Sequence, residues 1–341
     1  MTVLALLPLG VFIATVVLTG RFRQYALNSA LLDVPNARSS HTVPTPRGGG
    51  VVIVLTTTTA ILLAGYLDAL LWPSVLAFAG AGSIVAVVGF VDDRRGLSAR
   101  WRLLGHFAGA CWLLYWLGGV PPVLPAANDE AIRKALGVVA ILGIVWLTNL
   151  TNFMDGIDGI AASEIVTVSI GGWALALLTR PELGPWPLPL LLAAAALGFL
   201  VWNWPPAKIF MGDSGSGFLG LCLAGLALQA GWMAAPLFWA VMVLLGTFVV
   251  DATVTLFRRI VRGRTFYHAH RTHAYQHAAQ RFGGHRQVTL WVWAINVVWL
   301  FPIAYLAASG VLPGPAAVAL AYTPLALLAF WFDAGVEVIA S

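Results

Sequence analysis

The sequence predicts an all-α polytopic membrane protein, and three observations lead to this fold class. Of 341 residues, 60% are hydrophobic and only 10% are charged, whereas soluble domains carry about 25% charged residues. Apolar runs recur that approach the length of a membrane span, about 20 residues. No long polar linker separates these runs, so we expect a single integral-membrane domain over residues 1–341.

The apolar runs predict about 11 transmembrane helices. The first run is followed, not preceded, by basic residues (Arg21 and Arg23), which predicts a retained helix and not a cleaved signal peptide. Cys111 and Cys222 lie inside apolar runs and indicate neither disulfides nor a metal site. The predicted helices cover residues 3–19, 48–67, 74–91, 103–118, 136–153, 160–178, 187–203, 215–230, 235–257, 288–308 and 316–333.

Lysines and arginines predict the orientation, because cytosolic connections carry an excess of them. Only Arg133, Lys134 and Arg180 of the 19 lysines and arginines fall in the even-numbered connections. We therefore place the odd-numbered connections in the cytosol. The net charge of +5 then belongs to the cytosolic face, where it suits anionic lipids and phosphorylated substrates. We expect no nucleic-acid partner.

The third cytosolic connection reads Asn149-Leu-Thr-Asn-Phe-Met-Asp-Gly-Ile-Asp-Gly159. It places Asn152, Asp155 and Asp158 between two apolar runs. Ionisable groups at such positions are costly and commonly functional. This connection is the centre of the predicted site.

Two further cytosolic connections carry carboxylates. Asp92 and Asp93 follow an apolar run directly and are followed by four arginines, and such a pair is tolerable where a cation or the arginines compensate. Asp213 stands among glycines at the start of a helix, where it suits capping or a divalent cation. Nearby, Phe210 suits stacking on a base or packing beside the membrane.

The other two cytosolic connections are glycine-rich and histidine-rich. Gly48 to Gly50 begin a predicted helix, where glycines suit close approach of a ligand or of another helix. His268, His270 and His273 lie with Arg271 in a segment that holds most of the histidines. This segment suits zinc or a pyrophosphate, and it lacks nearby carboxylate and cysteine partners.

Polar loops gathered at one face favour an enzyme over a transporter, which places its polar groups nearer the bilayer centre. Asp251 and Asn296 are the weak indications of a polar path through the spans.

Four motifs occur in the order found in the polyprenyl-phosphate N-acetylhexosamine-1-phosphate transferases, and the resemblance runs from about residue 33 to 280. This superfamily is also called glycosyltransferase family 4. The fifth-connection motif resembles the O-antigen-initiating branch, including members that use UDP-N-acetylfucosamine or UDP-N-acetylglucosamine, more than the peptidoglycan-precursor phospho-MurNAc-pentapeptide transferases. The motifs are Asp92-Asp93, Asn149-x-x-Asn152-x-x-Asp155-Gly-x-Asp158-Gly, Phe210-Met-Gly-Asp213-Ser-Gly-Ser and His268-x-His270-Arg271-x-His273.

The resemblance implies a reaction and its partners. A UDP-N-acetylhexosamine and undecaprenyl phosphate would give the lipid diphosphate sugar and UMP, as the first membrane step of O-antigen or related polysaccharide synthesis. The cofactor would be Mg²⁺, with Mn²⁺ as a substitute. The protein would lie in the bacterial inner membrane with its active site facing the cytosol, and a homodimer is a further expectation.

The resemblance also implies roles for the motif residues. Asp213 and Asn152 would ligate Mg²⁺. Asp92 and Asp93 would face the lipid phosphate, with Asp92 nearer to it, by direct attack or through a phosphorylated aspartate. Asp155 and Asp158 would organise the uridine and sugar, and Phe210 would stack on uracil. The pyrophosphate or sugar would be held by His268, His270, Arg271 and His273.

Overall fold

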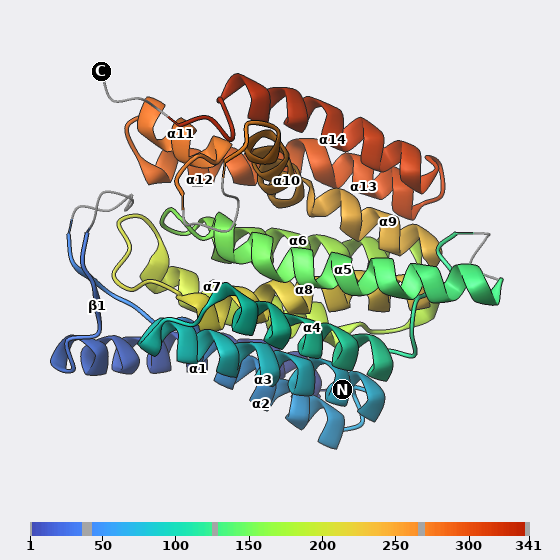
Figure 1. The fold of residues 1–341 in the computed structure, drawn as a ribbon. Helices are drawn as coiled ribbons and strands as arrows, with labels where there is room; N and C mark the ends of the chain where they lie inside the picture. Colours follow the sequence, from blue (N-terminus) through green and yellow to red (C-terminus); the bar gives the residue numbers. More distant parts are fainter. Residues whose placement is uncertain (1, 36–42, 125–128, 265–269, 338–341) are drawn as a thin grey trace.

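A computed structural model describes residues 2–35, 43–124, 129–264 and 270–337 (Figure 1). Over these residues the chain forms α-helices joined by short connections, one short 3-10 helix η2 (Pro181–Leu183) and one π-helical stretch η3 (Ile295–Leu300). The α-helices are α1 (Thr2–Asn28), α2 (Gly50–Tyr66), α3 (Trp72–Arg95), α4 (Ala99–Trp116), α5 (Glu130–Met154), α6 (Ile160–Thr179), α7 (Pro187–Asn203), α8 (Asp213–Met233), α9 (Ala235–Leu244), α10 (Gly246–Val261), α11 (Ala274–Arg281), α12 (His285–Ala294), α13 (Phe301–Ala308) and α14 (Gly314–Trp331).

The predicted all-α polytopic membrane fold is confirmed, but the number of 11 spans is not. Among the described residues, seven helices are long and apolar enough to cross a membrane, and a bent pair, α9 and α10, would make eight. Helices α2 and α7 are apolar but shorter. Helix α4 coincides with the remaining predicted range, and its first turn carries Arg100 and Arg102. All eleven predicted ranges therefore overlap helices, although not all of these helices have the length and composition of a full span.

Helix α8 forms the centre of the molecule. It packs against α2, α3, α5 and α9, and nearly all of its residues are buried. Small residues allow this close packing in a membrane protein. A methyl group added at Gly89 of α3 would lie only 2.5 Å from the Asp213 carbonyl oxygen. Helices α3 and α8 consequently approach each other most closely where α8 begins.

The prediction of one regular helix over 235–257 is wrong, because α9 and α10 meet at a bend of 64°. The predicted helix over 288–308 is also irregular, since η3 separates α12 from α13. The two irregularities are linked by buried polar groups. The Thr247 hydroxyl of α10 lies 2.9 Å from Asn296 Oδ1 of η3, and both residues contact Glu164 of α6.

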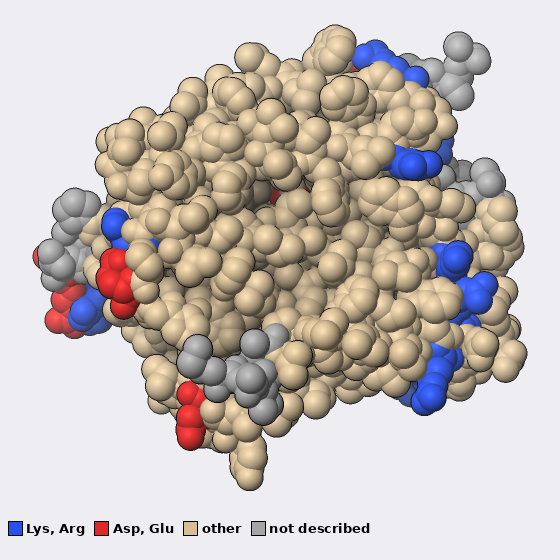
Figure 2. Space-filling model, turned by 180° about the vertical axis from the view of Figure 1, so that it is seen from behind, with Lys and Arg blue, Asp and Glu red and all other residues tan. Residues whose placement is uncertain are grey.

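The connections predicted to be cytosolic gather at one end of the molecule. Figure 1 shows the β1 strand, α11 and α12 at this end, and the first residues of α5 at the opposite end. The strands β1 (Leu32–Asp33) and β2 (Thr45–Pro46) form a short antiparallel hairpin. Figure 2 shows most of the visible Lys and Arg toward one end of this face, with a broad surface almost without charged residues between the two ends.

Some boundaries differ from the prediction. Helix α1 continues past the predicted end to Asn28, so Arg21 and Arg23 lie on its last turns. Helix α5 begins at Glu130, where the Asp129 side chain accepts a hydrogen bond from Ile132 N. The short helix α11 lies in a segment for which no element was predicted.

Candidate active site

Asp93 holds the beginning of α8 from the neighbouring helix α3. Its carboxylate oxygens accept hydrogen bonds from Asp213 N and Ser214 N, each at 3.2 Å. These are orphan donors of the α8 N-terminus, where a negative charge is favourable. Gly212 makes the approach possible, because it has φ +79° and a Cβ there would lie 2.8 Å from Asp93 Oδ2. Asp93 therefore places Asp213 as well as adding charge to the site.

Asp92 points to a different set of partners. Its Oδ1 accepts a hydrogen bond from Leu97 N at 2.5 Å, and its Oδ2 accepts one from Arg102 Nη1 at 3.0 Å. The same guanidinium lies 3.7 Å from Asp213 Oδ2, so Arg102 bridges the Asp92 and Asp213 carboxylates. Asp92 thus orders the arginine-rich connection and, through Arg102, is linked to Asp213.

Asn152 joins the end of α5 to the start of α8. Its Nδ2 donates to Asp213 Oδ1 at 2.8 Å and to Ser216 Oγ at 2.9 Å. Both amide hydrogens are used in these contacts, which leaves the Oδ1 atom available for another partner. The carboxamide consequently fixes the position of the Asp213 side chain.

A small cavity of about 20 Å³ lies where α3, α4, α5 and α8 meet. Asp92, Arg102, Asn152 and Asp213 line it, together with six further residues of these four helices. Two of the six are glycines, and two, His106 and Asn149, are polar. His106 was missed by the sequence analysis, because a single histidine in an apolar helix resembles any buried histidine. The remaining lining residues are Val88, Gly89, Phe153 and Gly217.

Asp155 follows the last residue of α5 and faces the same group of carboxylates. Burial raises its pKa well above the usual range, and the charges of Asp213, Asp158 and Asp93 raise it further. The repulsion indicates that these carboxylates surround one region of space. A cation bound in that region would lower the pKa of Asp155 again.

Asp158 connects three parts of the chain. Its Oδ2 accepts a hydrogen bond from Ala207 N at 3.0 Å, and its Oδ1 lies 3.2 Å from Nδ1 of His285 at the start of α12. Its carbonyl oxygen accepts a hydrogen bond from Thr289 Oγ1 at 3.0 Å. Asp158 therefore organises the α7–α8 connection beside the site. His285 is a further residue that sequence reasoning did not single out.

The first cytosolic connection packs directly on this centre. The Arg47 guanidinium donates to the Asp93 carbonyl oxygen and lies 3.9 Å from Asp93 Oδ1. The backbone of Phe210 is held on both sides, since its N donates to Pro46 O at 2.8 Å and its O accepts from Gly49 N at 2.9 Å. The glycine-rich turn thus fixes the position of Phe210.

The described part of the histidine-rich connection begins at His270, and His268 lies outside the described residues. The His270 and His273 rings stack with centroids 5.1 Å apart, and His273 lies 6.5 Å from the Phe153 ring. Burial, followed by the charges of His273 and Arg259, lowers the pKa of His270 to about 3. His270 is therefore neutral at physiological pH, and the exposed Arg271 supplies the positive charge of this segment.

The sequence of this chain is similar to those of known membrane transferases. The family described as glycosyl transferase family 4 matches residues 75–231. A decaprenyl-phosphate N-acetylglucosaminephosphotransferase of Mycobacterium tuberculosis is 32% identical to this chain, over 92% of the chain and 83% of the relative. The chain belongs to this family of polyprenyl-phosphate N-acetylhexosamine-1-phosphate transferases.

Two other relatives place the chain within the family. A probable undecaprenyl-phosphate N-acetylglucosaminyl 1-phosphate transferase of Bacillus subtilis is 29% identical over 84% of this chain and 80% of the relative. A phospho-N-acetylmuramoyl-pentapeptide-transferase of Synechococcus is 34% identical, but over only 57% of this chain and 59% of the relative. The match to the second kind of transferase is thus restricted to part of each protein.

The structure of this family member also identifies two basic residues that the sequence analysis counted only toward orientation. Arg47 contacts Asp93 and Arg102 contacts Asp92 and Asp213. Neither could be told apart from the neighbouring arginines in the sequence. Among the residues that the structure describes, no group of three or more His, Cys, Asp or Glu side chains is arranged to hold a metal ion. This finding offers no support for zinc in the histidine-rich connection.

Proposed function

We propose that this protein transfers an N-acetylhexosamine 1-phosphate from a UDP-sugar to undecaprenyl phosphate, releasing UMP. The observation that carries the proposal is the convergence of Asp92, Asp213, Asn152 and Arg102 on one small cavity in a chain of this family. An oxygen of the lipid phosphate would form a bond to the phosphorus that carries the sugar. The bond from that phosphorus to the bridging oxygen of UMP would break.

The charges of the site suit a magnesium ion, with manganese as a substitute. Arg47 pairs with Asp93, and Arg102 pairs with Asp92 and Asp213. Asp155 and Asp158 lie near the same carboxylates, so negative charge is in excess. Magnesium prefers oxygen ligands and commonly uses one or two carboxylates together with substrate phosphates. The Asp213 carboxylate and the Asn152 carboxamide oxygen would hold the ion. When bound, it would neutralise charge on the transferring phosphoryl group.

Hydrogen bonding at the aspartate pair supports direct attack over a phosphorylated aspartate. Both oxygens of Asp93 accept bonds from the α8 backbone, and both oxygens of Asp92 contact Leu97 N or Arg102. A carboxylate held in this way is a poor nucleophile. A phosphate monoester has its second pKa near 6 and is mostly a dianion at neutral pH, so the acceptor needs no strong base. Arg102 is the cation placed to receive it.

The donor nucleotide would lie between the α7–α8 connection and the histidine-rich connection. Phe210 would stack on uracil, and Asp155 would contact the sugar or the uridine. Arg271 would pair with the pyrophosphate, while the neutral His270 would offer a hydrogen bond. His268 stays in the proposed binding set without a structural account. Asp158 and His273 are both largely buried, which supports an organising role for each.

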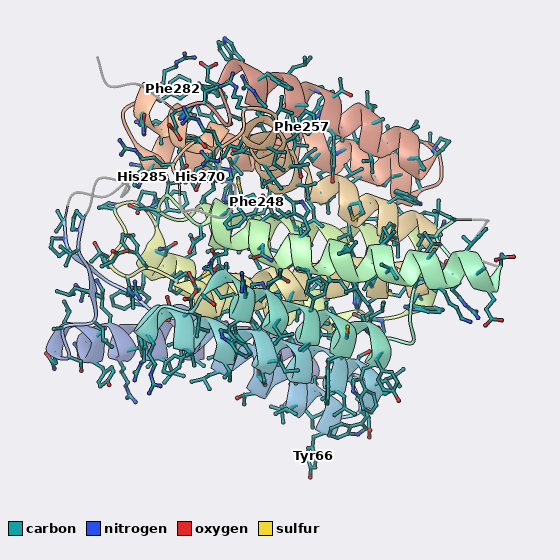
Figure 3. All side chains as sticks on the ribbon, in the orientation of Figure 1. Tyr66, Phe248, Phe257, His270, Phe282 and His285 are labelled. Atoms are coloured by element: carbon teal, nitrogen blue, oxygen red, sulfur yellow. The ribbon has the colours of Figure 1, made fainter. Side chains whose placement is uncertain are left out.

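An apolar cavity of about 280 Å³ suits the isoprenoid chain of the acceptor. It begins at Met154, the residue before Asp155, and extends to Trp291 and Trp331. Phe248 and Phe282, both labelled in Figure 3, line it from α10 and from the end of α11. Its lining is almost entirely apolar, as a hydrocarbon chain requires.

The basic end of the molecule would face the cytosol of a bacterial inner membrane, where a soluble nucleotide and a membrane lipid can meet. The product would begin O-antigen or a related cell-surface polysaccharide. Transfer of a peptidoglycan precursor is less well supported, since that similarity covers only part of the chain. Transport is also less well supported, because Asp251 and Asn296 are engaged by internal partners.

Release of UMP from purified protein in lipid nanodiscs tests the proposal. Undecaprenyl phosphate and a panel of UDP-N-acetylhexosamines would be supplied with Mg²⁺, beginning with UDP-N-acetylglucosamine. We expect UMP and a lipid diphosphate sugar in equal amounts for one or more donors. Absence of UMP with every donor would exclude the proposed reaction. UMP release without the lipid, together with a phosphorylated aspartate, would replace direct attack by the covalent route.

A further inference from the structure

Asp251 is a buried carboxylate on the second turn of α10, and the proposed reaction gives it no task. Its Oδ1 accepts a hydrogen bond from Ala274 N at 3.0 Å, and its Oδ2 accepts one from Tyr275 N at 2.9 Å. These are the first two backbone donors of α11. Asp251 therefore occupies the N-terminus of α11, as Asp93 occupies that of α8.

The same carboxylate reaches the imidazole that precedes α11. Its Oδ1 lies 3.2 Å from His273 Nδ1, a hydrogen bond when Nδ1 carries the proton. A carboxylate beside Nδ1 favours that protonated position. The ring of His273 stacks on His270 at 5.1 Å and on Tyr275 at 5.6 Å. One carboxylate thus fixes the helix start and, through His273, the ring of His270.

The contacts continue from α11 to the carboxylate centre. The Tyr275 hydroxyl donates to the Phe153 carbonyl oxygen at 2.9 Å, next to Asn152. It also lies so close to Gly156 that a Cβ there would collide with it. The hydroxyl is buried, and its pKa is raised well above the usual range by burial and by the charges of Asp251 and Asp155. Tyr275 therefore remains a neutral donor that ties α11 to the end of α5.

These contacts exclude the N-terminus of α11 as a binding site for the pyrophosphate, because an internal carboxylate already uses its donors. We infer that Asp251 is the positioning residue of the segment 270–275, and that it aims His270 and Arg271 at the donor nucleotide. The inference rests on the proposed function for the identity of that nucleotide. Figure 3 shows His270 near α10 and α11, at the same end of the molecule as His285.

The test compares Asp251→Asn and Asp251→Ala with the matched control Thr255→Val. Thr255 donates to the same carboxylate at 3.1 Å, but its loss leaves the two backbone bonds in place. We expect Asp251→Ala to raise KM for the UDP-sugar by about tenfold to 100-fold, as loss of an orienting partner commonly does, with a smaller change in kcat. Asp251→Asn, which retains one acceptor oxygen, should fall between Asp251→Ala and wild type, and Thr255→Val should match wild type.

Limited trypsin digestion of the full-length protein in nanodiscs gives a reading that does not depend on transfer. Arg271 is exposed, and cleavage after it should become about tenfold faster in Asp251→Ala, since local opening exposes the segment. Cleavage after Arg133, at the other end of the molecule, should not change. If both sites open together, Asp251 stabilises the whole fold and the inference is wrong.

Unchanged KM and unchanged cleavage after Arg271 would also overturn the inference. If wild-type protein releases no UMP from any UDP-sugar, the proposed function fails. The digestion still decides in that case whether Asp251 positions the segment 270–275.

Discussion

The side chain of Asp213 is 35% exposed, whereas those of Asp92, Asp93 and Asp158 are between 8% and 13% exposed. Asp213 is therefore the carboxylate of this group that an incoming ion reaches most easily. The other three are occupied by backbone donors, by guanidinium groups or by His285. This difference separates the residue expected to bind the metal from the residues expected to shape its surroundings.

Asp213→Asn should abolish most of the transfer while the fold persists, because Asn152 and Arg102 keep a partner of the same shape. We expect a loss of at least about 100-fold, in the range found when metal-site groups are altered. UMP release would be measured over a titration of Mg²⁺. Asp68→Asn, in the α2–α3 connection, is the matched control and should match wild type. Full activity of Asp213→Asn at low Mg²⁺ would contradict the metal assignment.

The lowered pKa of His270 predicts that the folded protein loses stability at acidic pH. The folded ring stays neutral until its pKa of about 3, whereas an unfolded histidine takes up a proton near pH 6.5. The unfolded state thus binds more protons between these values, and stability falls as the pH falls below 6.5. His270→Gln removes this contribution.

Thermal unfolding in detergent at pH 7.5 and pH 5.0 measures this effect. Between these two pH values, the free energy of unfolding should fall more in wild type than in His270→Gln. The expected difference is about 1 kcal/mol after allowing for the partial exposure of the ring. Equal losses would show that His270 also titrates normally in the folded protein.

At the scale of the elements, Glu164 holds together α6, α10 and η3. The single hydroxyl proton of Thr247 faces three acceptor oxygens, namely both oxygens of Glu164 at 3.0 and 3.1 Å and Asn296 Oδ1 at 2.9 Å. Asn296 Nδ2 donates to Glu164 Oε2 at 2.6 Å. A proton on the carboxyl group supplies the missing donor, because the carboxyl can then donate to the Thr247 hydroxyl while that hydroxyl donates to Asn296 Oδ1.

This count predicts that Glu164→Gln, whose amide also donates, keeps nearly the stability of wild type. Glu164→Leu leaves one amide hydrogen of Asn296 buried without its acceptor, while the other keeps Thr167 Oγ1 at 2.8 Å, and this variant should lose about 2 kcal/mol. Thermal unfolding in detergent measures both variants. A leucine variant as stable as the glutamine variant would show that the contacts add nothing to the packing of the bend.

The close approach of α3 and α8 gives a second prediction at this scale. A methyl group at Gly89 would lie 2.5 Å from the Asp213 carbonyl oxygen and 2.6 Å from Ser214 N, and these backbone atoms cannot rotate away. Gly89→Ala should therefore displace the start of α8 and lower kcat, with overpacking that costs about 1 to 3 kcal/mol.

Gly143→Ala in α5 is the matched control, because a Cβ there meets nothing within 4 Å. It should keep wild-type kcat and gain up to about 1 kcal/mol from helix propensity. Equal kcat values for the two alanine variants would show that the α3–α8 distance does not control the site.

At the scale of the whole molecule, the clustering of Lys and Arg at one end predicts that this end faces the cytosol. In a chain with Cys111→Ser, an exposed Arg262→Cys should react with a membrane-impermeant maleimide only after the membrane is opened. An exposed Glu182→Cys, at the other end, should react in intact cells. The reverse pattern would place the carboxylate centre outside the cytosol and would remove the proposed route to a soluble UDP-sugar.

Hydrophobic runs were sufficient to predict where the apolar helices lie, because burial in a bilayer demands long apolar segments, but they gave no indication of the polar helix α11. They contained no sign of the 64° bend, since residues 235–257 are apolar on both sides of Leu245. Motif order predicted that the aspartates of three connections belong to one site, and the structure brings Asp92, Asp93 and Asp213 together. Motif order could not divide their tasks, because the hydrogen bonds of Asp93 and Asp158 join residues far apart in the chain.

The partners of the polar groups within the spans could not be predicted from the sequence. Asp251 and Asn296 were read as weak signs of a transport path, and Glu164 was passed over. Their partners are a distant helix start for Asp251 and one another for Glu164 and Asn296. Such pairings arise only when the helices are packed.

The bend between α9 and α10 gives bilayer thickness an influence on the site. With a rise of 1.5 Å per residue, these helices of 10 and 16 residues are about 15 and 24 Å long. Neither reaches across a hydrocarbon core of about 30 Å, whereas the two together are longer than the core, and a bend is one way in which an over-long apolar stretch fits. Asp251 lies on the half nearer the basic end. We therefore expect a change in acyl-chain length to alter the direction of α10, and through Asp251 the positions of the His270 and His273 rings.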